Sequence, residues 1–152
     1  MTKDYEFYHG VVFTKLIHCA REPISLKTYS ADSKASYILN SAIGLYIKHS
    51  TKRLSPWTFS FQKEHQDEIQ ELKNSLKEVF LILVCGDDGI VTLGFAELKK
   101  ILDESHSDTE WISASRTPRK EYKVKGSDGT LSYKVSHVDF IDKILKAVET
   151  YR

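Results

Sequence analysis

Residues 37–61 read YILNSAIGLYIKHSTKRLSPWTFSF and bring apolar segments, turn residues and a basic segment into close succession. Runs of roughly four to eight β-branched, aromatic or alternating residues, bounded by Asn, Ser or Pro, are typical of strands. We expect turns at Asn40-Ser41 and at Ser55-Pro56, because these residue types favour turn geometry. The strands expected in and beside this stretch cover residues 36–39, 43–49 and 57–61.

The strand over residues 43–49 ends in a group of potentially cationic side chains. Lys48 and His49 stand at its end, and Lys52 and Arg53 follow after two hydroxyl residues. Core packing does not require such a group, whereas ammonium, guanidinium and hydroxyl donors together suit a phosphate or a carboxylate. We therefore expect a site for an anionic group here. The alternative is a solvated loop between two strands, because Lys and Arg are mostly exposed.

Apolar spacing predicts the remaining elements. Ile69, Leu72 and Leu76 recur at helical spacing and form one seam. Val79–Val84 is continuously apolar, which is typical of a central strand covered on both faces. Asp87-Asp88-Gly89 predicts a tight hairpin turn. The expected helices cover residues 4–20, 62–77, 94–103 and 138–151, and the further strands cover 24–30, 78–84, 90–93, 111–115, 121–124 and 130–135.

Length and element order favour a single domain. The chain has 152 residues, of which 41% are hydrophobic and 28% charged, as in ordinary globular domains. We expect an α/β or α+β fold with a central mixed β-sheet of about five or six strands, flanked by helices. The core is expected over about residues 4–103, with a C-terminal β-hairpin and helix as an extension over about 104–152.

Charge and cysteine usage limit the possible functions. The net charge is +1, from 22 basic and 21 acidic residues, so any binding of nucleic acid must come from local clustering. Cys19 and Cys85 lie in apolar runs without ligand-spaced partners, which argues against a zinc site. Charged residues within the first dozen positions do not fit a secretory segment, and no membrane association is expected. We expect a cytoplasmic protein.

A second basic segment follows the strand expected at residues 111–115. Aromatic residues accompany it, since Trp111 precedes it and Tyr122 lies between Lys120 and Lys123. Basic residues interleaved with aromatic ones suit RNA or single-stranded DNA. Glu121 interrupts the cluster, so a solvated hairpin is the alternative. The basic residues of this segment are Arg116, Arg119, Lys120, Lys123 and Lys125.

The order helix, three strands, helix, strand over the first ninety or so residues resembles the core of the restriction-endonuclease-like superfamily, the PD-(D/E)XK nucleases. In that family a carboxylate on the second core strand and a D/E-X-K motif on the third hold Mg²⁺ beside a phosphodiester. The alignment places Asn40 at the first acidic position and Tyr46-Ile47-Lys48 over the motif. Only the lysine matches. The resemblance therefore implies Lys48 as the catalytic residue of a degenerate site, unless Asp32, Glu6 or Glu22 supplies the missing acid.

Two functional hypotheses follow. In the first, the protein is directed to nucleic acid through a degenerate nuclease-like core and its basic strand end. In the second, it is a non-enzymatic module, such as a subunit, regulator or immunity-type protein, that binds an acidic protein partner. We expect no cofactor, with Mg²⁺ relevant only if an unrecognised carboxylate site exists, and if the protein is an enzyme it is a metal-dependent nuclease. A homodimer is compatible with either hypothesis, and the six histidines are scattered in the sequence and predict no site.

Overall fold

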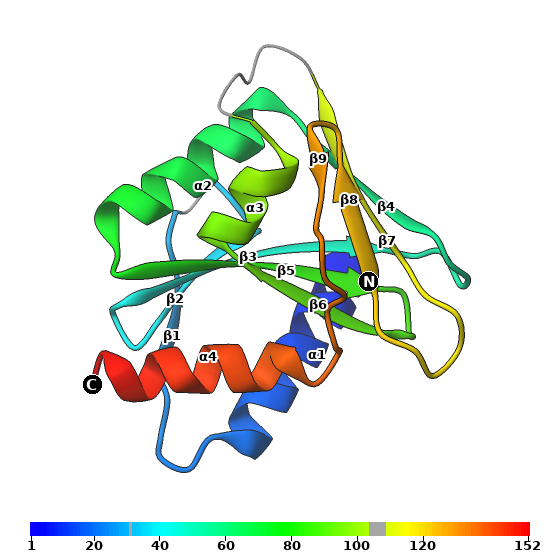
Figure 1. Cartoon of the computed structure of the whole chain (residues 1–152). Helices are drawn as coiled ribbons and strands as arrows, with labels where there is room; N and C mark the ends of the chain where they lie inside the picture. Colours follow the sequence, from blue (N-terminus) through cyan, green and yellow to red (C-terminus); the bar gives the residue numbers. More distant parts are fainter. Residues whose placement is uncertain (31, 104–108) are drawn as a thin grey trace.

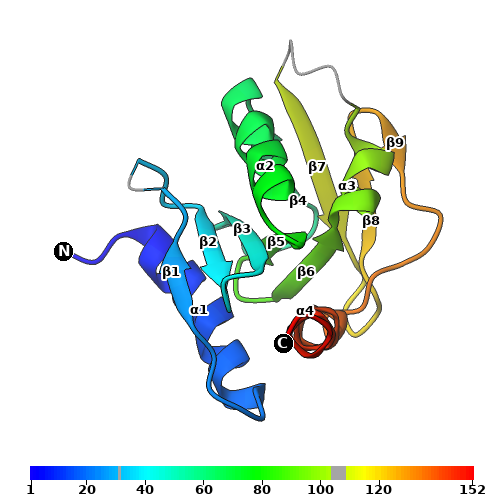
Figure 2. The same ribbon diagram turned by 90° about the vertical axis from the view of Figure 1, so that its left-hand side faces the viewer.

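The molecule is built in layers around a five-stranded mixed β-sheet (Figure 1). Helices α1 (Asp4–Cys19) and α4 (Asp139–Thr150) cover one face of this sheet. Helices α2 (Lys63–Ser75) and α3 (Phe95–Ile101), together with a four-stranded sheet, cover the other face (Figure 2). The expected α+β fold, with a mixed sheet flanked by helices, is confirmed.

The computed structural model describes residues 1–30, 32–103 and 109–152. The boundary expected near residue 104 falls outside these residues. Along the described part of the chain, none of the helices is both long and apolar enough to cross a bilayer. The strands are β1 (Leu26–Thr28), β2 (Ser36–Leu39), β3 (Ile43–Ser50), β4 (Trp57–Phe61), β5 (Glu78–Cys85), β6 (Gly89–Gly94), β7 (Glu110–Ser115), β8 (Lys123–Gly126) and β9 (Gly129–Thr130).

The five-stranded sheet has the order β1-β2-β3-β5-β6. Strands β1, β2 and β3 form an antiparallel meander, and β5 and β6 form an antiparallel hairpin. Strands β3 and β5 pair in parallel, with Ile43 opposite Glu78 and Ser50 opposite Cys85. A parallel pair needs a crossover connection, which here runs through β4 and α2. The C-terminal end of β3 is therefore a place where several loops meet.

Two apolar clusters lie on the two faces of this central sheet. Residues of β3 and β5 alternate between the clusters because successive side chains in a strand point to opposite faces. Leu45 and Ile47 join α1 and α4, whereas Tyr46 faces α2 and the second sheet. The continuous apolar run of β5 is thus explained, since both of its faces are covered.

Strand β4 belongs to the second sheet, which has the order β4-β7-β8-β9. It pairs with β7 from Trp57 opposite Ala114 to Phe61 opposite Glu110. The sequence did not predict this second sheet, because alternation in β4 shows that one face is buried and not which strand pairs with it. Trp57 and Phe59 are each only 2% exposed and belong to the core between the two sheets.

Candidate functional site

The end of strand β3 delivers Lys48 and His49 to opposite faces of the central sheet. The Nζ of Lys48 donates to the carbonyl of Ser60 and lies 3.0 Å from Nδ1 of His65. The ring of His49 stacks on the ring of Tyr8 from α1, with centroids 4.6 Å apart. Both side chains at this strand end are half-buried, Lys48 against β4 and α2 and His49 against α1.

Lys48 and His65 form a polar pair on the α2 side of the sheet. The Nδ1 of His65 accepts a hydrogen bond from the backbone N–H of Gln62 at 3.1 Å, so the neutral ring carries its proton on Nε2. Burial lowers the pKa of Lys48 to about 8. Burial and the nearby charge of Lys48 lower the pKa of His65. The protonation states of the two groups are therefore linked, because a charged Lys48 favours a neutral His65.

On the α1 side, His9 is 5% exposed and forms a second polar group. The hydroxyl of Tyr37 donates to the carbonyl of Lys34 at 3.0 Å and lies 2.7 Å from Nδ1 of His9. Since the hydroxyl has a single proton, Nδ1 of His9 donates to Tyr37. Burial, followed by the charge of His49, lowers the pKa of His9 to about 4, so this ring is neutral at physiological pH.

Both polar groups open onto one pocket of about 470 Å³, which we call the Lys48 pocket. Three histidines distant in sequence thus meet at one place, which sequence reasoning missed. No sequence spacing could have indicated this, because the three come from α1, β3 and α2. The lining residues are Tyr5, His9, Asp32, Ser33, Lys34, Ala35, Tyr46, Ile47, Lys48, His49, Glu64, His65 and Glu68.

The acidic positions expected from the nuclease alignment are not all close to Lys48. Asn40 lies in the turn between β2 and β3, at the opposite end of β3, with φ of 50°. Its Oδ1 accepts a hydrogen bond from the backbone N–H of Ser25 at 2.8 Å. Tyr46 opposes Ser36 across β2 and β3, so the chain segment beside Lys48 is the loop before β2.

Of the three substitute acids, Asp32 alone lines the Lys48 pocket. Glu6 accepts a hydrogen bond from the backbone N–H of Lys3 at 3.0 Å, at the start of α1. Glu22 pairs with Arg152. The alternatives Glu6 and Glu22 therefore have local structural roles away from Lys48.

Two further acids of the pocket, Glu64 and Glu68, come from α2 and were not expected. The Oε2 of Glu68 accepts hydrogen bonds from the hydroxyls of Ser33 at 2.8 Å and Ser36 at 2.6 Å. This carboxylate holds the loop before β2 against α2. Among the described residues, the only group of three or more potential metal ligands within 4.8 Å of one another lies outside this pocket. The pocket thus mixes amines, imidazoles and carboxylates without a converging set of acids.

The two predicted basic segments meet at the end of β3. The backbone N–H of Arg116 donates to the hydroxyl of Ser55 at 3.1 Å, across 61 residues of sequence. The loop between β3 and β4 therefore lies against the loop between β7 and β8 (Figure 1). We call their exposed cations the basic edge; its members are Lys52, Arg53, Arg119, Lys120 and Lys123.

Arg116 and Tyr122 take structural roles beside the basic edge. The Nε of Arg116 lies 2.7 Å from Oδ2 of Asp88, and its guanidinium lies over the ring of Tyr122. The hydroxyl of Tyr122 donates to the same carboxylate, and the ring is fully buried. Asp88 thus neutralises Arg116. The expected stacking on Tyr122 has no exposed ring to use.

Comparison of the chain with protein-family models, with curated proteins and with solved structures found no match.

Proposed function

We propose that the protein binds nucleic acid through the phosphate backbone, along the basic edge at the end of β3. The observation that carries this proposal is the hydrogen bond between Arg116 and Ser55, which joins two basic segments into one surface. Five exposed cations then face solvent together, and Glu121 is the exposed acid that stands between two of them in sequence. Such local clustering can attract a polyanion although the net charge of the chain is only +1.

Contacts to phosphates, without reading of bases, fit the aromatic side chains best. Trp57, Phe59 and Tyr122 are buried in the core and offer no face to a nucleobase. Trp111 is 38% exposed, but it stands at the other end of β7 from Arg116, where its backbone N–H donates to the hydroxyl of Ser127. Phosphate contacts fix position and carry no sequence information. We therefore expect binding that is independent of base sequence.

In this proposal, the phosphates bind along the basic edge and outside the Lys48 pocket. Asp32, Glu64 and Glu68 line that pocket and would repel a phosphate. Lys48 already donates to the carbonyl of Ser60 and contacts His65, so its N–H donors are engaged within the fold. In this proposal, Lys48 anchors the end of β3 to α2 and leaves the loop with Lys52 and Arg53 exposed.

The test is fluorescence anisotropy of a labelled duplex and a labelled single strand over a series of salt concentrations. If four of the five cations contact phosphates, the log–log slope of affinity against salt is about −3 to −4 for a duplex. The double variant Lys52→Glu/Arg53→Glu is expected to lose roughly tenfold or more in affinity and to flatten that slope by about 2.

The matched control is Lys77→Glu/Lys146→Glu, which makes the same change in charge. Lys77 follows α2 and Lys146 lies on α4, and both are exposed. Lys77 donates its N–H to Ala42 just before β3 begins, so it lies at the end of β3 opposite to the basic edge. Equal losses in the two double variants would contradict the proposal. Weak binding with no salt dependence would favour an acidic protein partner instead.

A further inference from the structure

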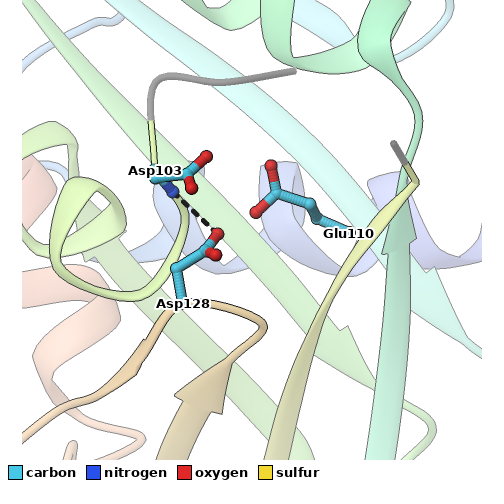
Figure 3. Close-up of side chains that lie close together, drawn as sticks. All are labelled: Asp103, Glu110 and Asp128. Carbon is cyan, nitrogen blue, oxygen red and sulfur yellow. Dashed lines mark hydrogen bonds between the residues drawn. The ribbon is translucent and has the colours of Figure 1, made fainter. Parts of the chain in front are cut away.

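Three carboxylates face one another where α3 ends and β7 begins, and they do not line the Lys48 pocket (Figure 3). We call Asp103, Glu110 and Asp128 the acidic trio. Each offers an oxygen, and these oxygens all lie within 4.8 Å of one another. Asp103 follows α3, Glu110 opens β7, and Asp128 lies in the turn between β8 and β9. Clusters of acidic residues are common on protein surfaces, so whether this cluster binds a ligand has to be argued from its surroundings.

Glu110 provides a second and independent observation. It is only 6% exposed, and its carboxylate points toward the two aspartates (Figure 3). Its Oε1 accepts a hydrogen bond from Nε2 of Gln66 at 3.2 Å. Its Oε2 is buried and has no hydrogen-bond donor among the described residues. An orphaned buried carboxylate oxygen costs free energy unless a cation or a donor reaches it.

Backbone contacts fix the positions of the aspartates before any ligand arrives. The N–H of Asp128 donates to the carbonyl of Ile101 at 2.9 Å, which binds the turn to the last residue of α3. The N–H of Asp103 donates to Oδ2 of Asp128 at 2.9 Å. Gly129 permits this close approach, because a Cβ there would collide with the carbonyl of Lys100. Backbone contacts of the fold therefore bring Asp103 and Asp128 together.

Charge adds to the argument. Within residues 1–30, 32–103 and 109–152, no lysine or arginine forms an ion pair with Glu110 or Asp128. The facing carboxylates repel one another at neutral pH, and a cation between them would remove that repulsion. Hard carboxylate oxygens are the ligands that Ca²⁺, Mg²⁺ and Mn²⁺ take in proteins.

We propose that Asp103, Glu110 and Asp128 form a structural site for a divalent cation of the hard, oxygen-binding class, with Ca²⁺ preferred. The preference follows from coordination chemistry, since Ca²⁺ accepts carboxylate ligands in flexible arrangements, whereas Mg²⁺ demands near-ideal octahedral geometry and keeps several of its waters. The ion would join the end of α3, the start of β7 and the turn between β8 and β9. It would also occupy the position that the orphaned Oε2 of Glu110 faces.

Thermal unfolding of the full chain, first stripped with EDTA, tests this site at neutral pH with Ca²⁺, Mg²⁺ or Mn²⁺ added. At a Ca²⁺ concentration about a hundred times Kd, the Tm is expected to rise by roughly 5–10 °C. Glu110→Gln and Asp128→Asn keep the size of the side chains and are expected to lose most of that rise. Glu121→Gln, an exposed residue just before β8 at the end away from the trio, removes the same charge and is expected to keep it.

A direct measurement covers the case in which a variant fails to fold. Trp111 neighbours Glu110, so Tb³⁺ bound at the trio is expected to emit on excitation of tryptophan, and Ca²⁺ is expected to displace it. The proposal is overturned if none of the three cations raises the Tm of the unmodified protein. It is equally overturned if Glu110→Gln and Asp128→Asn keep the full rise, or if bound Tb³⁺ gives no emission that Ca²⁺ displaces.

Discussion

Glu110 shows how strongly one position can couple the stability of this fold to pH. The side chain is nearly excluded from water, and the carboxylates of Asp128 and Asp103 lie close to it. Burial, with the facing carboxylate of Asp128 next, raises the pKa of Glu110 from 4.5 to about 7. Gln66 donates to this carboxyl group and opposes the rise, without cancelling it. Between pH 4.5 and about pH 7, the folded protein therefore holds a proton on Glu110 that the unfolded chain has already lost.

The sign of the effect on stability follows from this raised pKa. The contribution of Glu110 is fully present below pH 4.5 and is lost as the pH rises to about 7. Without divalent cations, Glu110→Gln is expected to gain about 1–3 kcal/mol over the unmodified protein between pH 5 and pH 8. The lowered pKa of Asp128 gives a contribution that is present above pH 3.8 and is lost only at lower pH, so it changes little between pH 5 and pH 8. Urea unfolding in EDTA at both pH values is the measurement, and a parallel pH dependence of the two proteins would contradict the expectation.

Among the described helices and strands, β5 contributes the most side chains to the buried core. Its residues alternate between the two apolar clusters, and Leu81 and Leu83 face the second sheet. They are 1% and 0% exposed, respectively. Leu81→Ala or Leu83→Ala is expected to lower the free energy of unfolding by roughly 2–5 kcal/mol, because each leaves a cavity. Leu54→Ala is the matched control, since Leu54 is 73% exposed and its loss should cost less than about 0.5 kcal/mol.

Near-equal stability of the Leu83→Ala and Leu54→Ala variants in denaturant unfolding would contradict this view of β5.

The position of β5 could be predicted because six consecutive apolar residues leave few other interpretations. The sheet to which β4 belongs could not be predicted in the same way. Its alternation identifies a buried face, but the partner strand β7 lies about fifty residues away in sequence. Pairing across that distance depends on tertiary packing, which local periodicity does not record.

The same limit applies to the candidate sites. The apolar run that stops at Lys48 indicated a polar strand end, and the structure places Lys48 there. His65 and Glu68 were missed because their approach to Lys48 depends on how α2 packs on the sheet. The acidic trio was missed for a similar reason, since the loop, strand and turn that supply it are joined only in the folded chain. A hydrogen bond such as that between Ser55 and Arg116 likewise has no sequence signal.

For the whole molecule, we expect no cleavage of duplex DNA or RNA in Mg²⁺ or Mn²⁺. Metal-assisted hydrolysis needs carboxylates that converge on an ion beside the scissile phosphate. In the Lys48 pocket, Glu68 is held by two serines, and the described residues there include no converging set of three ligands. A nuclease assay with both metals, run beside Lys48→Ala, is the measurement. Cleavage that disappears in Lys48→Ala would contradict this prediction and would identify Asp32 or Glu64 as a missing ligand.

The membership of β4 in the second sheet has a consequence for the newly made polypeptide. On the ribosome, β4 is synthesised about fifty residues before β7, the strand beside which it lies in the native fold. Until then, the backbone of β4 has no strand to pair with, although β3 and β5 can already pair and offer an apolar face to Trp57, Phe59 and Phe61. Unpaired strand edges make incompletely folded chains prone to aggregation, which is one reason that chaperones exist. The growing chain therefore passes through a stage at which its first sheet is complete and a strand of its second sheet is still unprotected.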